Sequence, residues 1–187
     1  IGTPYFKIEG LASISANRLL LGVREIGDTY KNPIFVIKVY LLKYEVRDGE
    51  YFTTGKPELF FSVDRNDLEL TAPVALSSIE YNKKDNSLFM LTSYEVSQTD
   101  EGLGAYLWKV DLSSVKNKTA KLVPITKKDG SHIHFSHKAE GLAMLPNNKI
   151  IVVHDDDAVT GRKDVSDKEN QFYRLVHNFA YTIIEFR

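Results

Sequence analysis

Short apolar runs separated by polar turns form the main pattern of the chain. Val, Ile, Leu, Tyr and Phe gather in runs of roughly five to ten residues, and clusters of Asn, Asp, Gly and Lys separate them. This pattern is typical of β-strands. The predicted strands fall into three groups: 7–13, 18–24, 34–45 and 59–63; then 74–81, 87–94, 105–111 and 120–124; then 139–145, 149–153 and 179–186. The third group has one strand fewer than the others.

The strand groups repeat in sequence as well as in spacing. Glu-Gly-Leu-Ala occurs at 9–12 and again at 140–143, each time before a polar turn and a strongly apolar strand. A degenerate third copy covers 73–95. Aligning Ile8-Glu9 with Ile79-Glu80 keeps an acidic residue in register, whereas counting back from the turn places Ser78 or Leu76 there. We favour Glu80 as the middle member. Self-similarity of this kind indicates a repeat architecture.

Repeated units of four antiparallel strands are the blades of a β-propeller. We therefore predict an all-β fold with about three such blades, over 7–66, 73–126 and 138–187, the last one strand short. A closed propeller has about 4–8 blades. The chain is accordingly expected to be the C-terminal part of a longer propeller, whose missing blades come from the rest of the protein. The alternatives are a complete small β domain and a β-sandwich.

Composition narrows the classes of partner. The net charge is −1 and no basic stripe recurs, so neither a nucleic-acid nor a membrane partner is expected. No apolar run approaches the roughly 18 residues of a membrane-spanning helix. The chain contains no cysteine, which excludes disulfides and thiol chemistry. A periplasmic, secreted or cytoplasmic location is compatible with this composition.

Two longer segments carry a resemblance to a known family. KIEGLA followed by RLLLGVRE, and later HKAEGLAMLPNNKIIVVHDDD, resemble the DUF3616 family of bacterial β-propellers, which is similar to the esterase-like domains associated with phytases. The resemblance implies that the motif glutamates begin the innermost strands near a central channel, with Arg24 on the adjacent strand. The chain departs from the family pattern in having GVRE in place of GLRGP. Its middle unit also has SIEYN where the motif is expected.

Carboxylates at the start of inner strands are expected to point toward the propeller axis. Acidic residues at the end of a following strand add further oxygen ligands, and calcium accepts 6–8 such oxygens in irregular geometry. The candidate metal ligands are Glu9, Glu80, Glu140, Asp155, Asp156 and Asp157. Alternatively, the glutamates accept backbone N–H bonds or pair with neighbouring basic residues such as Arg24 or Lys138.

Basic residues beside the motifs give a candidate anion site. Arg24, Lys138 and His137 could receive a phosphate or carboxylate of a small-molecule substrate. The resulting hypothesis is a calcium-dependent, phytase-like or esterase-like hydrolase with a site in the axial channel, where calcium neutralises the phosphate and a carboxylate activates water. No catalytic residue is assigned. The alternative is a non-catalytic propeller, a binding or scaffold module with a structural cation or none.

The segment HIHFSH offers a weaker metal hypothesis. On a strand, His132 and His134 would lie on one face, which suits a transition metal. No third ligand is fixed by spacing, and the neighbouring charged residues favour a solvated loop instead.

Overall fold

The structure, a computed structural model, describes residues 1–96, 102–136, 138–155 and 179–186. The described chain is all-β, with two short 3-10 helices, η1 (Arg65–Leu68) and η3 (Leu112–Ser114). Every strand pairing is antiparallel, and the strands form three sheets. Within these residues no helix is long and apolar enough to cross a membrane.

The three sheets follow one another along the chain. The first contains β1 (Tyr5–Ser15), β2 (Arg18–Gly27), β3 (Ile34–Arg47), β4 (Glu50–Thr53) and β5 (Glu58–Val63). The second contains β6 (Ala75–Asn82), β7 (Ser87–Glu95), β8 (Leu103–Asp111), β9 (Val123–Pro124) and β10 (His134–Phe135). The third contains β11 (Lys138–Leu145), β12 (Lys149–Asp155) and β13 (Ala180–Glu185). Each sheet begins with a strand hairpin, and the later strands of the first two sheets add to β3 and to β8.

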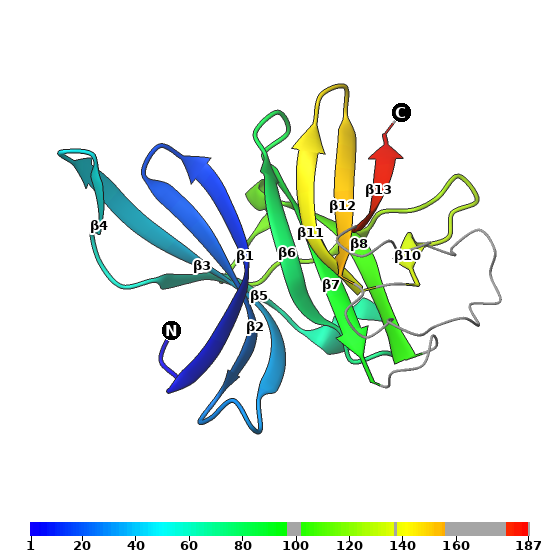
Figure 1. Cartoon of the computed structure of the whole chain (residues 1–187), viewed down its shortest axis with the longest axis horizontal. Helices are drawn as coiled ribbons and strands as arrows, with labels where there is room; N and C mark the ends of the chain where they lie inside the picture. Colours follow the sequence, from blue (N-terminus) through cyan, green and yellow to red (C-terminus); the bar gives the residue numbers. More distant parts are fainter. Residues whose placement is uncertain (97–101, 137, 156–178, 187) are drawn as a thin grey trace.

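The sheets stand side by side with the second in the middle (Figure 1). Strand β6 contacts β1 on one side and β11 on the other. One apolar core fills the space between the first two sheets and includes Leu20, Phe61 and Met90. A second core, with Leu91 and Leu142, fills the space between the second and third. The middle sheet is therefore covered on both faces, which explains why every residue of β7 except the last, Glu95, is buried.

The predicted three groups of strands are confirmed, and every predicted strand overlaps an observed one. Strand β4 was not predicted. It arises because Asp48 and Gly49 both adopt positive φ, 52° and 83°, and turn the end of β3 back on itself. Asp-Gly favours this tight hairpin. The predicted strand at 120–124 is also shorter than expected, because its pairing with β8 covers only Val123–Pro124 while β10 pairs with the other end of β8.

Candidate functional site

The repeated motif marks a β-bulge at the same step in the first strand of each sheet. Glu9 is the extra residue of β1: the residues on either side of it pair with adjacent residues of β2. Glu140 has the same position in β11 against β12, and Ser77 has it in β6 against β7. Because a bulge redirects the side chains around it, the three strands share this local geometry. The sequence repeat thus corresponds to a structural repeat.

The middle member of the repeat is Ser77, and the predicted register at Glu80 is wrong. Glu80 pairs with Phe89 beyond the bulge, in the register of Ala12 and Ala143. Its carboxylate accepts a hydrogen bond of 3.3 Å from the backbone N–H of Met144 in β11. Sequence alignment missed the correspondence because the middle strand keeps the bulge without the acidic side chain. Glu80 instead links the second sheet to the third.

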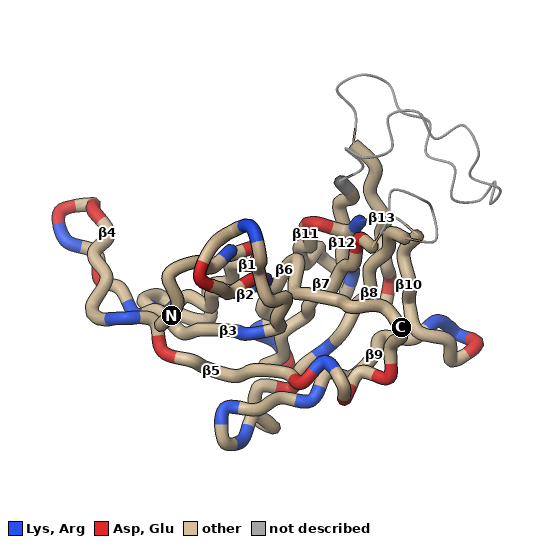
Figure 2. Tube along the Cα trace, turned by 90° about the horizontal axis from the view of Figure 1, so that it is seen from below, with Lys and Arg blue, Asp and Glu red and all other residues tan. Residues whose placement is uncertain are grey.

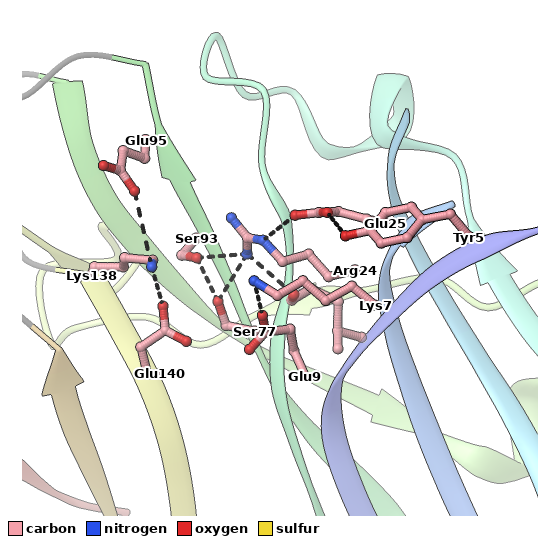
Figure 3. A network of polar contacts seen from close by, with 11 residues as sticks. Tyr5, Lys7, Glu9, Arg24, Glu25, Ser77, Ser93, Glu95, Lys138 and Glu140 are labelled. Atoms are coloured by element: carbon pink, nitrogen blue, oxygen red, sulfur yellow. Dashed lines mark hydrogen bonds and ion pairs between the residues drawn. The ribbon is translucent and has the colours of Figure 1, made fainter. Parts of the chain in front are cut away.

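Both motif glutamates form ion pairs within their own strands (Figure 3). Lys7 Nζ lies 2.6 Å from Glu9 Oε1, and Lys138 Nζ lies 2.8 Å from Glu140 Oε1. The glutamate side chains are only 18% and 24% exposed. A Lys-x-Glu pattern therefore accompanies each copy of the motif, and each carboxylate has an ammonium group beside it. This agrees with the predicted alternative in which the glutamates pair with neighbouring basic residues.

Lys138 also faces the middle sheet. Its Nζ lies 4.0 Å from Glu95 Oε2, at the end of β7. The ammonium group thus lies between carboxylates of two sheets, with Glu140 the nearer partner (Figure 3). An anion bound by Lys138 would have to compete with the carboxylates of Glu95 and Glu140 for its ammonium group.

Arg24 occupies the gap between the first and second sheets. It is a buried residue of β2, and its Nη1 donates to the Leu76 carbonyl at 3.2 Å, to Ser77 Oγ at 3.2 Å and to Ser93 Oγ at 2.9 Å. Ser77 and Ser93 are themselves hydrogen-bonded to each other. The position that holds a Lys–Glu pair in β1 and β11 is therefore filled in β6 by a guanidinium group from the neighbouring sheet (Figure 3).

The charge of Arg24 is balanced from its own sheet. Glu25 Oε1 lies 3.8 Å from Arg24 Nε, and Tyr5 Oη donates a 2.7 Å hydrogen bond to Glu25 Oε2. The hydrogen bond to Glu25 raises the pKa of the Tyr5 phenol, with smaller contributions from desolvation and from nearby carboxylate charge. The Phe35 ring lies 5.6 Å from the guanidinium carbon. Arg24 is consequently part of a packed polar network that joins β1, β2, β6 and β7.

The remaining candidates lie partly outside the described residues. His137, Asp156 and Asp157 are outside them, and Asp155 is described only as the last residue of β12, where it pairs with Lys138. Within the described ranges, no group of three or more His, Cys, Asp or Glu side chains is arranged to hold a metal ion. Calcium binding accordingly stays a prediction.

Of the histidines in HIHFSH, His132 and His134 lie at the edge of the second sheet, across β7 and β8 from the bulge of β6. His132 Nε2 lies 2.9 Å from the Leu107 carbonyl oxygen, and His134 Nε2 lies 3.1 Å from Tyr94 Oη. Both rings pack against Tyr106, with centroid separations of 5.0 and 4.8 Å. Desolvation lowers the pKa of both imidazoles. Both rings therefore rest on aromatic side chains, but His134 stays solvent-exposed as expected, whereas His132 is half-buried.

Sequence reasoning also missed a cavity of about 640 Å³ beside η1. Its apolar lining includes Val63, Leu68 and Leu122, and charged residues of both signs border it, among them Asp67 and Lys121. No sequence signal pointed to it, because it forms where residues 116–122 approach β5 and η1. The cavity is open to solvent, and its lining includes no residue of the bulged strands β1, β6 and β11.

Comparison with protein-family models, with curated proteins and with solved structures gave no match to this chain.

Proposed function

We propose that the chain forms part of a β-propeller and serves as a non-catalytic scaffold or binding module. Support for the propeller comes from the repeat of one sheet plan three times, with β1, β6 and β11 side by side and each bulged at the same step. In this arrangement the bulged strands are the innermost ones. Further blades of the same plan would complete the ring.

The observation that carries the non-catalytic role is the pairing of each motif glutamate with a lysine. Glu9 and Glu140 have ammonium partners at 2.6 and 2.8 Å, so a positive charge already lies where a bound cation would have to sit. Calcium takes 6–8 oxygen ligands, and the corresponding position in β6 is the hydroxyl of Ser77, which Arg24 contacts. The motif in this proposal stabilises the inner strands, and the lysines serve in place of a structural cation.

A calcium-dependent phytase-like or esterase-like hydrolase is the second candidate. Its support is that Glu9 and Glu140 lie at equivalent bulges on the two strands that flank β6, and that both side chains reach solvent. Calcium would then displace Lys7 and Lys138, and the released ammonium groups together with Arg24 would receive a phosphorylated or ester substrate.

The two candidates differ in what the glutamates do for stability. We would measure the thermal unfolding midpoint in EDTA and in millimolar calcium for the wild type, for Glu9→Gln and for Glu140→Gln. Glu58→Gln, at an exposed position of β5, serves as the control. The scaffold proposal expects no calcium-dependent shift, together with a small loss of stability in each motif variant of about 1 kcal/mol or less.

Hydrolysis of a phosphomonoester and of a carboxylic ester is assayed on the same proteins. Turnover that requires calcium and disappears in Glu9→Gln would replace the scaffold proposal with the hydrolase. Calcium-independent stability and no Glu9-dependent turnover would support the scaffold proposal.

A further inference from the structure

The first and third sheets each leave one apolar face open, at opposite ends of the row of sheets (Figure 1). On the first sheet, Ile8 and Leu11 of β1 are exposed, Leu11 at 60%. On the third sheet, Tyr181 and Ile183 of β13 are exposed, Ile183 at 51%. In the perpendicular view, charged residues lie at the turns and also along several strands (Figure 2). Both faces therefore carry exposed apolar side chains, and on the face of Leu11 they border a small buried cluster of the first sheet, formed by Leu21, Val23 and Tyr40.

The shared bulge allows the sheets to be compared residue by residue. Leu11, two positions after the bulge of β1, corresponds to Ile79 in β6 and to Leu142 in β11. Ile79 is buried in the core shared with the first sheet, and Leu142 in the core shared with the second. The open face at Leu11 is thus the face that, on the other two sheets, packs against the preceding sheet.

The open face of the third sheet corresponds to the face of the first sheet that packs against the second sheet. In β12, Ile151 and Val153 have the registers of Leu20 and Gly22 in β2. Leu20 is fully buried against the second sheet, and a Cβ on Gly22 would lie 2.6 Å from Leu76 Cδ2 of β6. This is the face that receives the following sheet. The chain therefore carries, on two separate sheets, both halves of an interface that it builds twice internally.

We propose that a second copy of this chain covers these faces, with the third sheet of each copy packed on the first sheet of the other. Because the open faces of the first and third sheets belong to one sequence, every folded copy presents both surfaces of the contact. Two such contacts would close a ring of six sheets, within the range of about 4–8 found in propellers. Each contact joins two different surfaces, the third sheet of one copy and the first sheet of the other. The pair of copies forms a closed ring only if a two-fold axis relates them, so that both contacts form at once. The inference rests on the repeat architecture of the proposed function.

Gly10 and Ile79 provide the template for one contact between the copies. A Cβ on Gly10 would lie 2.9 Å from Ile79 Cγ1, so the side chain of the second sheet sits directly on the glycine of the first. Gly141 of β11 has the same register as Gly10 of β1. The atom nearest to a Cβ added at Gly141 is Val153 Cβ at 3.9 Å, so a side chain from another sheet has room to pack there. Leu11 of the second copy, which corresponds to Ile79, would lie over Gly141.

The molar mass of the 187-residue chain in solution tests the proposal directly. Light scattering or sedimentation over a range of protein concentrations should give twice the 21.2 kDa of one chain. Leu11→Glu and Ile183→Glu should each give a monomer, because each places a charge in the interface. Tyr30→Glu, at an exposed tyrosine outside both faces, should leave the dimer intact. A wild-type chain that stays monomeric at every concentration, or open-ended filaments, would overturn the proposal.

Crosslinking separates the proposed contact from other dimers. The chain has no cysteine, so Leu11→Cys and Gly141→Cys can be prepared singly, mixed and oxidised. The template implies Cβ atoms close enough for a disulfide, at about 3.5–4.5 Å. The mixture should give a crosslinked dimer, whereas either variant alone should not. Crosslinking of Leu11→Cys with itself would contradict the head-to-tail contact.

The thermal unfolding midpoint of each variant is measured first, because only a folded variant can show by its molar mass whether the contact is lost. The calcium and hydrolysis tests are repeated on Ile183→Glu, whose substitution is on β13 and away from the motif. Their result concerns the proposed function alone, so a failure of association and a failure of the scaffold role remain separate outcomes.

Discussion

Arg24 Nη1, from the first sheet, lies 2.9 Å from Ser93 Oγ of the second sheet. A single guanidinium group thereby joins β2 to β7, and it also contacts Leu76 and Ser77 of β6, the hairpin partner of β7. Buried charges persist when they are paired and hydrogen-bonded. Arg24 meets both conditions through the serines and through Glu25. The contact therefore fixes how the first two sheets pack.

Replacement of this guanidinium should be costly. Arg24→Met is expected to lower the free energy of unfolding by about 3 kcal/mol, because it removes three hydrogen bonds and leaves Glu25 without its cation. Arg24→Lys should fall between wild type and Arg24→Met. Arg18→Met, at the exposed start of β2, is the control and should stay within about 0.5 kcal/mol of wild type. Urea unfolding measures the difference, and equal values for Arg24→Met and Arg18→Met would contradict the assigned role.

A methyl group at Gly10 should destabilise the protein. It would meet Ile79 Cγ1 at 2.9 Å and the backbone nitrogen of Ile79 at 3.2 Å, and the backbone cannot move aside easily. Overpacking of this kind costs about 1–3 kcal/mol. Gly141→Ala occupies the same motif position with no close neighbour, so at protein concentrations where the chain is monomeric it should be nearly neutral. Similar losses in the two variants would show that the cost comes from the strand itself.

The indole of Trp108 depends on one buried acceptor. Its Nε1 donates a 2.8 Å hydrogen bond to Thr92 Oγ1, and both residues are buried. Thr92→Val keeps the shape but leaves the N–H unsatisfied, which should cost about 1–3 kcal/mol. When Trp108→Phe is already present, the added cost of Thr92→Val should be much smaller. Additive losses in this double-mutant cycle would argue against the hydrogen bond.

Acid should weaken the fold before its carboxylates protonate. Desolvation lowers the pKa of His132 and His134 below the ordinary value of 6.5. Below that pH the unfolded chain binds protons that the folded chain does not. Their contribution is therefore fully present above pH 6.5 and is lost as the pH falls toward the lowered pKa values. Unfolding free energies measured between about pH 7.5 and pH 5 should decline.

The pair His132→Gln and His134→Gln is the control for this pH dependence. Replacing both imidazoles should flatten the decline. The carboxylates of Asp85, Asp111 and Asp129, whose pKa values are lowered, act only at more acidic pH and so do not obscure this window. A decline that is unchanged in the double variant would assign the acid sensitivity to other groups.

Local pattern was sufficient to locate all strands except β4 and β10. Apolar alternation and turn residues predicted the three groups, and the repeated Glu-Gly-Leu-Ala predicted that the first and third share a plan. It also anticipated that the motif glutamates could pair with basic neighbours. These features depend on residues close in sequence, so the chain encodes them without reference to the rest of the fold.

Tertiary structure decided the register of the repeat and the partners of its polar groups. Ser77 shares the bulge of Glu9 and Glu140 although its side chain is not acidic, because a bulge is a property of backbone pairing between two strands. Arg24 reaches Ser93, 69 residues away, only because the first two sheets pack face to face. The sequence determined strands and spacing by local propensity, whereas contacts between sheets required the long-range packing that brings distant strands together.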